Sequence, residues 1–229
     1  MMKNLIKFLF IVMLLGVLSC EKSQIQTEPV KEVTLKKNEA VVANSSSSDV
    51  ALLDLLYDKV EGESSVPAAN SLDVVKITEF LDFGCAYCYN FKKILEKVMA
   101  SFRDKLEVET IIVSWRGENL PKFFYYAQKK GKGEEVKSML FGLYHDSNVK
   151  NIGNPDILQT VGEEIGLFGS DVKVEDVIND PEIVEMYKKS EEKVRKFKVK
   201  GTPTVIVEDS MKINWAEENL TNVINYLLK

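Results

Sequence analysis

Hydrophobic and polar positions divide the chain into an apolar leader, a polar stretch and a longer region with strand and helix patterns. Residues 8–18 form an apolar run that follows Lys3 and Lys7. The run is too short to span a bilayer, which needs about 20 apolar residues, but it suits the hydrophobic part of a secretory signal peptide. Residues 21–48 are polar, end in serines and follow neither a helical nor a strand period. They predict a disordered tether.

The pattern of a folded domain begins at Asp49. This residue is a suitable N-cap for a helix to about Val60, because the apolar residues between them recur at helical spacing. Val74–Phe83 and Val108–Trp115 are largely apolar, as expected of buried strands, and residues 85–102 between them have a helical pattern. The order strand, helix, strand favours an α/β fold.

The second half of the chain predicts a helical block and then a return to strands. The block extends from about Pro121 to Val199, and Asn154-Pro155 and Asp180-Pro181 are typical cap-and-proline helix starts. The elements expected after it are strands at Thr204–Glu208 and Lys212–Asn214, and a final helix that Asn214 caps with Glu217 in a capping box.

These boundaries predict four parts. They are a signal peptide at 1–19, a lipidated N-terminus and tether at 20–48, a helix and loop at 49–71, and one α/β domain at 72–229 with a helical insertion at about 119–199.

Net charge narrows the choice of partners. The formal charge is −5, and removal of residues 1–19 with Lys3 and Lys7 would make it −7. A mildly acidic chain argues against nucleic acid as a partner and against a basic patch that binds anionic lipid. The hydrophobic content of 45% is ordinary for a globular protein.

The leader ends in Val17-Leu18-Ser19-Cys20, which resembles a bacterial lipobox. The resemblance implies that Cys20 becomes the lipidated first residue and anchors the protein to a membrane. An uncleaved anchor, or a chance cysteine after a signal peptide, is the alternative. The expected location is the periplasm or cell envelope, where disulfides are permitted. The sequence does not say which membrane holds the anchor.

Cys85 and Cys88 are the other two of the three cysteines. A zinc site needs four ligands, and the chain has one histidine, His145, expected in a capping or surface role at a helix end. A structural disulfide of this spacing closes a very small loop and would stabilise little. A redox centre fits best, because the pair follows a strand and opens a helix whose N-terminus favours a thiolate. Cys85 would then attack and Cys88 would resolve the mixed disulfide.

The second candidate motif is Gly201-Thr202-Pro203-Thr204, at the head of an apolar strand. Proline is tolerated there only where its missing N–H is not needed. A cis Thr202–Pro203 bond would expose the backbone of Thr202 to an extended substrate. An ordinary trans proline at a strand start is equally compatible with the sequence.

Together these motifs resemble those of the thioredoxin superfamily, and more narrowly of the DsbA-like thiol:disulfide oxidoreductases. The shared pattern is E-F-x-D-F-x-C-x-x-C-Y-x-F after a strand, followed later by G-T-P-T-V. The resemblance covers about residues 72–229. It implies an α/β, thioredoxin-like fold with an inserted helical domain.

The resemblance also implies roles for individual residues. Cys85 would be the nucleophile, Cys88 the resolving thiol, Pro203 the cis-proline and Thr202 its substrate-contacting neighbour. Glu79, six positions before Cys85, matches an acidic residue beneath the cysteines. A carboxylate there would accept the proton of the resolving thiol. A surface strand residue is the alternative.

Ala86-Tyr87 departs from the Pro-His of the strongly oxidising members of that family. A histidine between the cysteines would stabilise the thiolate of the reduced form, whereas tyrosine supplies no positive charge. We therefore expect a milder oxidant. Ala86 and Tyr87 are expected to contact the substrate.

The sequence therefore predicts a membrane-tethered, extracytoplasmic enzyme that forms disulfides in exported proteins by exchange at Cys85–Cys88. No metal or cofactor is expected. The expected partners are exported proteins with cysteine thiols and a membrane redox partner that reoxidises the pair. A reductase or isomerase on the same scaffold, or a non-catalytic binding lipoprotein, remains the alternative.

Overall fold

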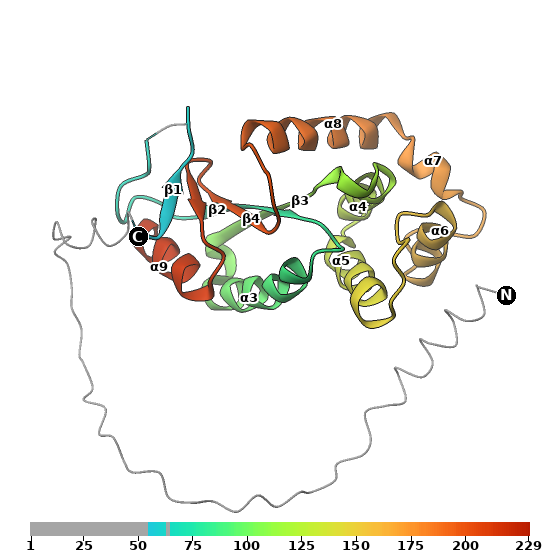
Figure 1. Ribbon diagram of the computed structural model, residues 1–229, viewed down its shortest axis with the longest axis horizontal. Helices are drawn as coiled ribbons and strands as arrows, with labels where there is room; N and C mark the ends of the chain where they lie inside the picture. The colour runs from blue at the N-terminus through green and yellow to red at the C-terminus, as the bar shows by residue number, and fades with distance from the viewer. Residues whose placement is uncertain (1–54, 63–64) are drawn as a thin grey trace, which may run out of the picture. The chain divides into compact units, whose positions relative to one another are not determined.

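The computed structural model describes residues 55–62 and 65–229, which form a mixed five-stranded sheet covered by helices (Figure 1). The strand order is β1-β5-β4-β2-β3. β2 runs parallel to β3, whereas its other neighbour, β4, is antiparallel to it. The strands are β1 Tyr57–Lys59, β2 Val75–Leu81, β3 Leu106–Ile112, β4 Thr204–Val207 and β5 Met211–Ile213.

The central strand β2 brings the chain to the edge of the sheet at which the cysteine motif lies. Its residues are buried except for Lys76, as expected of a strand with partners on both sides. Leu81 lies opposite Ile112 in the parallel partner β3. The carboxyl ends of β2 and β3 therefore meet at one edge. Helix α3 (Ala86–Phe102), which connects the two strands, begins at the same edge.

Helices cover both faces of the sheet, and Figure 1 shows α3 and α9 together below it, with α8 above. Ile77 of β2 belongs to a buried cluster with Phe91 of α3 and Val223 of α9 (Glu217–Leu227). Phe80 points to the opposite face, because successive strand residues alternate. There its ring meets Phe197, which follows α8, at 5.7 Å.

The inserted helices between β3 and β4 have an apolar core of their own. Their bounds are α4 Asn119–Lys129, α5 Gly133–Phe141, the π-helical turn η3 Gly142–Asp146, α6 Pro155–Glu164, α7 Val174–Ile178 and α8 Pro181–Lys196. α4 packs against α5, α7 and α8. Asn154 and Asp180 cap α6 and α8 through their side chains, so both predicted helix starts are confirmed.

The predicted helix from Asp49 to Val60 is wrong over its described residues, 55–60, none of which is helical. Residues 57–59 form β1 and pair antiparallel with β5, with Tyr57 opposite Ile213. The hydrogen bonds offered by the exposed edge of β5 outweigh a helical spacing that is only local. Residues 49–54 lie outside the described residues.

The final helix also begins later than predicted. Its N-cap is Ala216, which makes no side-chain cap, and not Asn214. The Asn214 side chain instead accepts a long hydrogen bond of 3.4 Å from the Ala216 N–H, within the turn before the helix. Trp215 in this turn packs its ring against Phe91, which fixes the turn on α3 and delays the helix start.

The predicted signal peptide, Cys20 and the tether lie outside the described residues. Within the part of the chain that the structure describes, none of the helices combines the length and the apolar character needed to cross a membrane.

Candidate active site

The two thiols of the Cys-x-x-Cys motif lie in the first turn of α3. Cys85 is the N-cap residue, with an extended backbone, and its carbonyl accepts a hydrogen bond from the Tyr89 N–H at 3.1 Å. Its side chain is half-buried, whereas that of Cys88 is completely buried. Both are free thiols in this structure. One thiol is accessible and the other lies behind it.

The loop before β4 lies directly beside the accessible thiol. Cys85 Sγ donates a hydrogen bond of 3.2 Å to the carbonyl oxygen of Thr202. The Thr202–Pro203 peptide bond is cis, the geometry that the resemblance implied. The structure thus brings together two motifs that are 117 positions apart in the chain.

Cys88 is kept in its protonated form by its surroundings. Burial raises the pKa of Cys88 well above that of a free thiol. Hydrogen bonds with the Thr202 side chain and the Asp82 backbone lower this pKa and offset only part of the effect. Cys88 is therefore a neutral thiol at ordinary pH.

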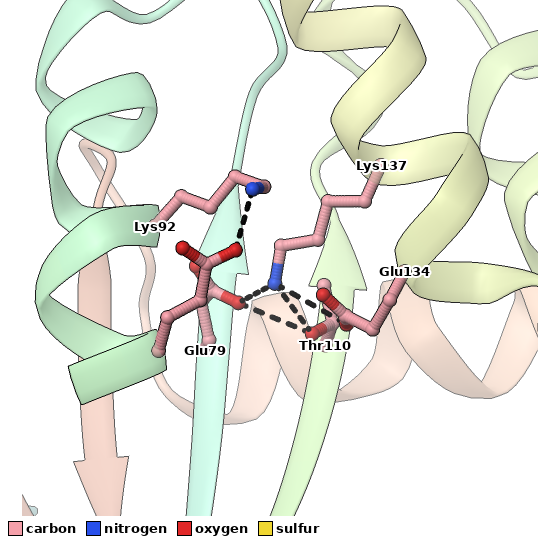
Figure 2. Close-up of polar contacts among 6 residues, drawn as sticks. Glu79, Lys92, Thr110, Glu134 and Lys137 are labelled. Carbon is pink, nitrogen blue, oxygen red and sulfur yellow. Dashed lines mark hydrogen bonds and ion pairs between the residues drawn. The ribbon is translucent and has the colours of Figure 1, made fainter. Parts of the chain in front are cut away.

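Glu79 lies in a buried polar cluster between the sheet and the inserted helices, as Figure 2 shows. Its Oε2 accepts hydrogen bonds from Lys137 Nζ of α5 at 2.7 Å and from Thr110 Oγ1 of β3 at 3.1 Å. Glu134 lies 3.7 Å from the same ammonium group. Both Glu79 and Lys137 are almost fully buried, so Glu79 is not a surface strand residue.

The position of Glu79 relates it to the resolving thiol. Side chains alternate along β2, so Glu79 shares its face with Ile77 and Leu81. Leu81 belongs to the same buried cluster as Cys88. Among the described residues, no hydrogen-bond partner lies at Glu79 Oε1. Glu79 therefore lies on the face of β2 that also carries Leu81, with one carboxylate oxygen that no described residue hydrogen-bonds.

Ala86 and Tyr87 form the exposed surface between the cysteines. Tyr87 is 64% exposed, and its ring lies 5.9 Å from that of Trp215. The two rings form an aromatic surface next to Cys85. Ala86 is also exposed. Both residues are accessible to a substrate that approaches the accessible thiol.

An ion pair that the sequence analysis missed lies under the loop that carries Cys85. Arg116 Nε donates to Asp82 Oδ1 at 2.9 Å, and the same oxygen accepts the Gly84 N–H at 2.5 Å. Arg116 ends the short 3-10 turn η2 (Ser114–Arg116), just after β3. The signal available in the sequence was topological, since residues that follow two adjacent parallel strands meet at the same edge.

His145 is likewise closer to the site than predicted. It lies in η3, and its Nε2 is 2.9 Å from the carbonyl oxygen of Phe83, two residues before Cys85. Its ring stacks on Tyr89, with centroids 4.8 Å apart. The predicted capping or surface role is wrong, because the helical insertion folds its π-helical turn back onto the active-site loop.

The described residues contain no group of three or more His, Cys, Asp or Glu side chains that could hold a metal ion. What the site offers is an accessible thiol at a helix N-terminus, a buried thiol one turn behind it and a cis-proline loop in contact with the first. On this sheet and helix order, these features define a thioredoxin-fold protein of the dithiol–disulfide exchange class.

Comparison with known families makes the class more specific. Residues 105–226 match the DSBA-like thioredoxin domain, so the chain belongs to that family. The thiol:disulfide interchange protein DsbA of Burkholderia cepacia is 25% identical in an alignment of 178 positions that covers 73% of this chain and 80% of that protein. The protein of the same name from Buchnera aphidicola (subsp. Acyrthosiphon pisum) is 24% identical in an alignment of 174 positions that covers 68% of this chain and 80% of that protein. The chain is a thiol:disulfide oxidoreductase.

Solved structures agree with the fold. The oxidoreductase NmDsbA1 of Neisseria meningitidis has a TM-score of 0.58 at 25% identity, covering 74% of this chain and 88% of its own. The oxidoreductase DsbA of Xylella fastidiosa has a TM-score of 0.61 at 17% identity, covering 75% and 92%. A DsbA of Proteus mirabilis, solved with a non-covalently bound peptide, has a TM-score of 0.60 at 15% identity, covering 81% and 97%. The predicted thioredoxin-like fold with a helical insertion is confirmed.

Proposed function

We propose that this oxidoreductase is a membrane-tethered, extracytoplasmic oxidase that introduces disulfides into exported proteins through Cys85 and Cys88. The observation that carries the proposal is the contact of 3.2 Å between Cys85 Sγ and the Thr202 carbonyl, in front of a buried Cys88. It places an accessible sulfur beside a backbone segment that can pair with an extended chain. The name thiol:disulfide interchange protein, carried by two relatives, supports the same chemistry.

The reaction begins from the oxidised enzyme, in which Cys85 and Cys88 form a disulfide. A substrate thiolate attacks Cys85 Sγ, the bond between the two cysteines breaks, and a mixed disulfide forms at Cys85. Cys88 leaves with the electron pair and takes up a proton. A second substrate thiolate then attacks the substrate sulfur of the mixed disulfide and releases Cys85. The substrate loses two electrons, and the enzyme gains them as a dithiol.

The buried environment of Cys88 bears on the first of these steps. Burial raises the pKa of Cys88, so its thiolate is a poor leaving group unless a proton is supplied as the disulfide breaks. Once protonated, Cys88 does not attack the mixed disulfide again. During reoxidation the same proton must leave. Glu79, with one carboxylate oxygen that has no partner among the described residues, is the group that accepts it.

Substrate recognition falls to the exposed residues around Cys85. Thr202 offers its backbone next to Pro203, and Tyr87 offers an exposed ring beside the sulfur. A substrate segment in an extended conformation can pair with the first and lay an apolar side chain against the second. Ala86 leaves room for that approach, because its side chain ends at Cβ.

Tethering follows from the lipobox-like sequence that ends in Cys20. Acyl chains on Cys20 would hold the enzyme at a membrane of the periplasm or cell envelope. A tether of residues 21–48 would have a reach of roughly 30 Å as a flexible coil. The reduced pair needs an electron acceptor, and a redox protein in the same membrane is the partner that such a tether suits.

The test uses two variants and a reduced, unfolded substrate with paired cysteines. Cys85→Ser abolishes disulfide transfer, because no accessible sulfur remains. Cys88→Ala, incubated with the disulfide-bonded form of the same substrate, accumulates a mixed disulfide at Cys85, because Cys85 attacks the substrate disulfide and no Cys88 remains to resolve the product. The mixed disulfide is visible as a mass increase on a non-reducing gel. Unchanged transfer by Cys85→Ser would rule out this mechanism, and binding of a partner that survives loss of both thiols would favour a binding lipoprotein.

The direction of electron flow is decided by the reduction potential of the pair. A potential between about −120 and −200 mV in glutathione buffers supports an oxidase. A potential near about −270 mV would instead assign the protein to the reductases.

A further inference from the structure

The Arg116–Asp82 pair lies in the loop before the nucleophile, and the proposed exchange steps leave it without a role. Asp82 lies three residues before Cys85, and its backbone carbonyl accepts the Cys85 N–H at 3.0 Å. The Asp82 side chain is 6% exposed and accepts hydrogen bonds from both Arg116 Nε and the Gly84 N–H. The carboxylate therefore fixes the loop before the thiol and the guanidinium at the same time.

Gly84 locates the guanidinium more closely. A Cβ placed on Gly84 would lie 2.2 Å from Arg116 Nη2 and 2.4 Å from Arg116 Cζ. The guanidinium therefore lies flat against the backbone of the residue that precedes Cys85. Any side chain other than hydrogen at position 84 would displace it. Glycine here permits close approach of a cation to the active-site loop.

The Tyr144 ring is a third group that contacts the guanidinium, besides Asp82 and the Gly84 backbone. Its Cζ lies 5.2 Å from the centre of the Tyr144 ring, in a cation–π contact. The Arg116 side chain is 45% exposed, and it uses Nε alone for the ion pair. The pKa of Arg116 is raised, chiefly by its hydrogen bond to Asp82 and also by the charges of Asp82, Tyr144 and Cys85.

The residues between the cysteines supply no cation, since they are Ala86 and Tyr87. A thiolate at Cys85 lies at the helix N-terminus, and the Arg116 guanidinium lies against Gly84, the residue before it. The oxidised enzyme has no thiolate. A cation near Cys85 therefore stabilises the reduced form alone, and it makes the disulfide a stronger oxidant.

We propose that Arg116, held by Asp82 against Gly84, is a positioning residue that sets the oxidising strength of the Cys85–Cys88 pair by supplying the positive charge absent from between the cysteines. The inference rests on the proposed function of the two cysteines as a redox pair. It adds that the charge comes from the turn after β3 and from outside the motif. Asp82 moderates the charge, since a carboxylate so close to the loop opposes a thiolate.

The equilibrium with glutathione measures this effect directly. Reduced enzyme, with a thiolate at Cys85 and a thiol at Cys88, reacts with oxidised glutathione and one proton to give enzyme disulfide and two reduced glutathione molecules. The enzyme loses two electrons, and the glutathione disulfide bond breaks as the enzyme disulfide forms. A more stable thiolate shifts this equilibrium toward the reduced enzyme.

Two substitutions move the equilibrium in opposite directions. Arg116→Gln removes the cation and should favour the oxidised enzyme by about 3- to 10-fold, where tenfold is about 30 mV. Asp82→Asn keeps an oxygen for Arg116 and Gly84 but removes the negative charge, so it should favour the reduced enzyme by a similar factor. Arg116→Lys keeps the positive charge, so its equilibrium with glutathione should lie close to that of the unmodified protein. The double variant with Arg116→Gln and Asp82→Asn should have an equilibrium with glutathione close to that of the unmodified protein.

Lys129→Gln is the matched control, because it also removes one exposed cation from an ion pair. Lys129 ends α4, a helix of 11 residues that starts after the Arg116 turn, so it lies about 16 Å further along the helix. It should leave the equilibrium unchanged. Circular dichroism and thermal melts of every variant identify any that fails to fold.

The outcomes separate this inference from the proposed function. Opposite shifts in Arg116→Gln and Asp82→Asn support it. Equal potentials in all folded variants, with lowered melting temperatures alone, would make the pair a structural anchor and overturn the inference while the redox pair stands. A pair that forms no disulfide at any glutathione ratio in the unmodified chain would overturn both.

Discussion

At the scale of single residues, two cysteines of one motif meet different surroundings, and this difference divides their roles. Cys85 is half-buried at the end of the helix and contacts the Thr202 backbone, whereas Cys88 is fully buried. Burial disfavours a charged sulfur, so the pKa of Cys88 is raised. In the proposed exchange, the half-buried thiol of Cys85 meets the substrate and the buried thiol of Cys88 keeps its proton until reoxidation.

The protonation of Cys88 makes the stability of the reduced protein depend on pH. A free thiol ionises at about pH 8.5 in the unfolded chain, whereas Cys88 in the folded protein keeps its proton above that pH. Cys88 therefore leaves the free energy of unfolding unchanged below about pH 8, where both states hold the proton. Above that pH it lowers the free energy of unfolding, because only the unfolded chain releases the proton. We expect the free energy of unfolding of Cys85→Ser to fall with pH above about 9, by up to about 1.4 kcal/mol per pH unit, relative to the variant lacking both thiols.

Urea unfolding of both variants between pH 7 and 10 measures this difference. The double variant is the control, since Tyr125, whose pKa is also raised by burial, is present in both. Parallel curves for the two proteins would contradict the assignment of a buried, protonated Cys88.

Individual residues were predictable from the sequence to different degrees. The thiols and Pro203 lie in short motifs, and Glu79 lies at a fixed distance before Cys85 on a strand that reads as buried. Arg116 and His145 carry no such pattern, because their proximity to Cys85 arises from chain segments distant in sequence. Polar contacts that depend on the packing of two segments cannot be read from the spacing within either one.

At the scale of elements, the strongest predictions were those in which local sequence and burial agree. β2, α3 and the capped starts of α6 and α8 have apolar patterns and cap residues that point to the same structure. β1 is the counter-example. Its three residues have the spacing of a helix but pair with the edge of β5, and Leu56 and Tyr57 pack against the sheet cluster. The spacing of apolar residues within one segment does not indicate a partner strand more than 150 positions away.

Helix α5 contributes Lys137, which links the inserted helices to the central strand through Glu79. Removal of one member of a buried ion pair leaves an uncompensated charge. We expect Lys137→Met and Glu79→Gln each to lower the free energy of unfolding by about 3 kcal/mol. The double variant should lose less than the sum, because it leaves neither charge unpaired.

A double-mutant cycle by urea unfolding measures the coupling between the two side chains. Lys129→Met is the matched control, since it breaks an exposed pair with Glu182 and should cost at most about 1 kcal/mol. Additive effects of Lys137→Met and Glu79→Gln would mean that the two groups do not support each other.

At the scale of the whole molecule, the fold brings three distant segments to one edge of the sheet. The cysteine motif follows β2, the Arg116 turn follows β3, and the cis-proline loop precedes β4. The strand directions explain why these segments meet. β3 is parallel to β2, so both strands end at this edge, and β4 is antiparallel to β2, so it starts there. All three segments belong to the α/β domain, so the chemistry of the site does not depend on the lipid anchor proposed at Cys20.

This independence predicts the behaviour of Cys20→Ala in the full chain. Two or three acyl chains on Cys20, at about 0.8 kcal/mol for each buried CH₂, hold a protein at a membrane until detergent is added. We expect the unmodified chain in the membrane fraction of a bacterium that processes lipoproteins, and Cys20→Ala in the soluble fraction after cleavage or as an unprocessed precursor with no attached lipid.

Cys85→Ser is the matched control for this experiment, because it also removes one cysteine but leaves the lipobox intact, and it should stay with the membrane.

The purified domain without residues 1–48 should have the same reduction potential as the detergent-extracted full chain, because the thiol site is formed by residues of the α/β domain. Labelling of the unmodified chain with a fatty acid, and loss of the label in Cys20→Ala, completes the assignment. A Cys20→Ala protein that keeps its membrane attachment and never carried label would show that residues 1–19 remain as an uncleaved anchor.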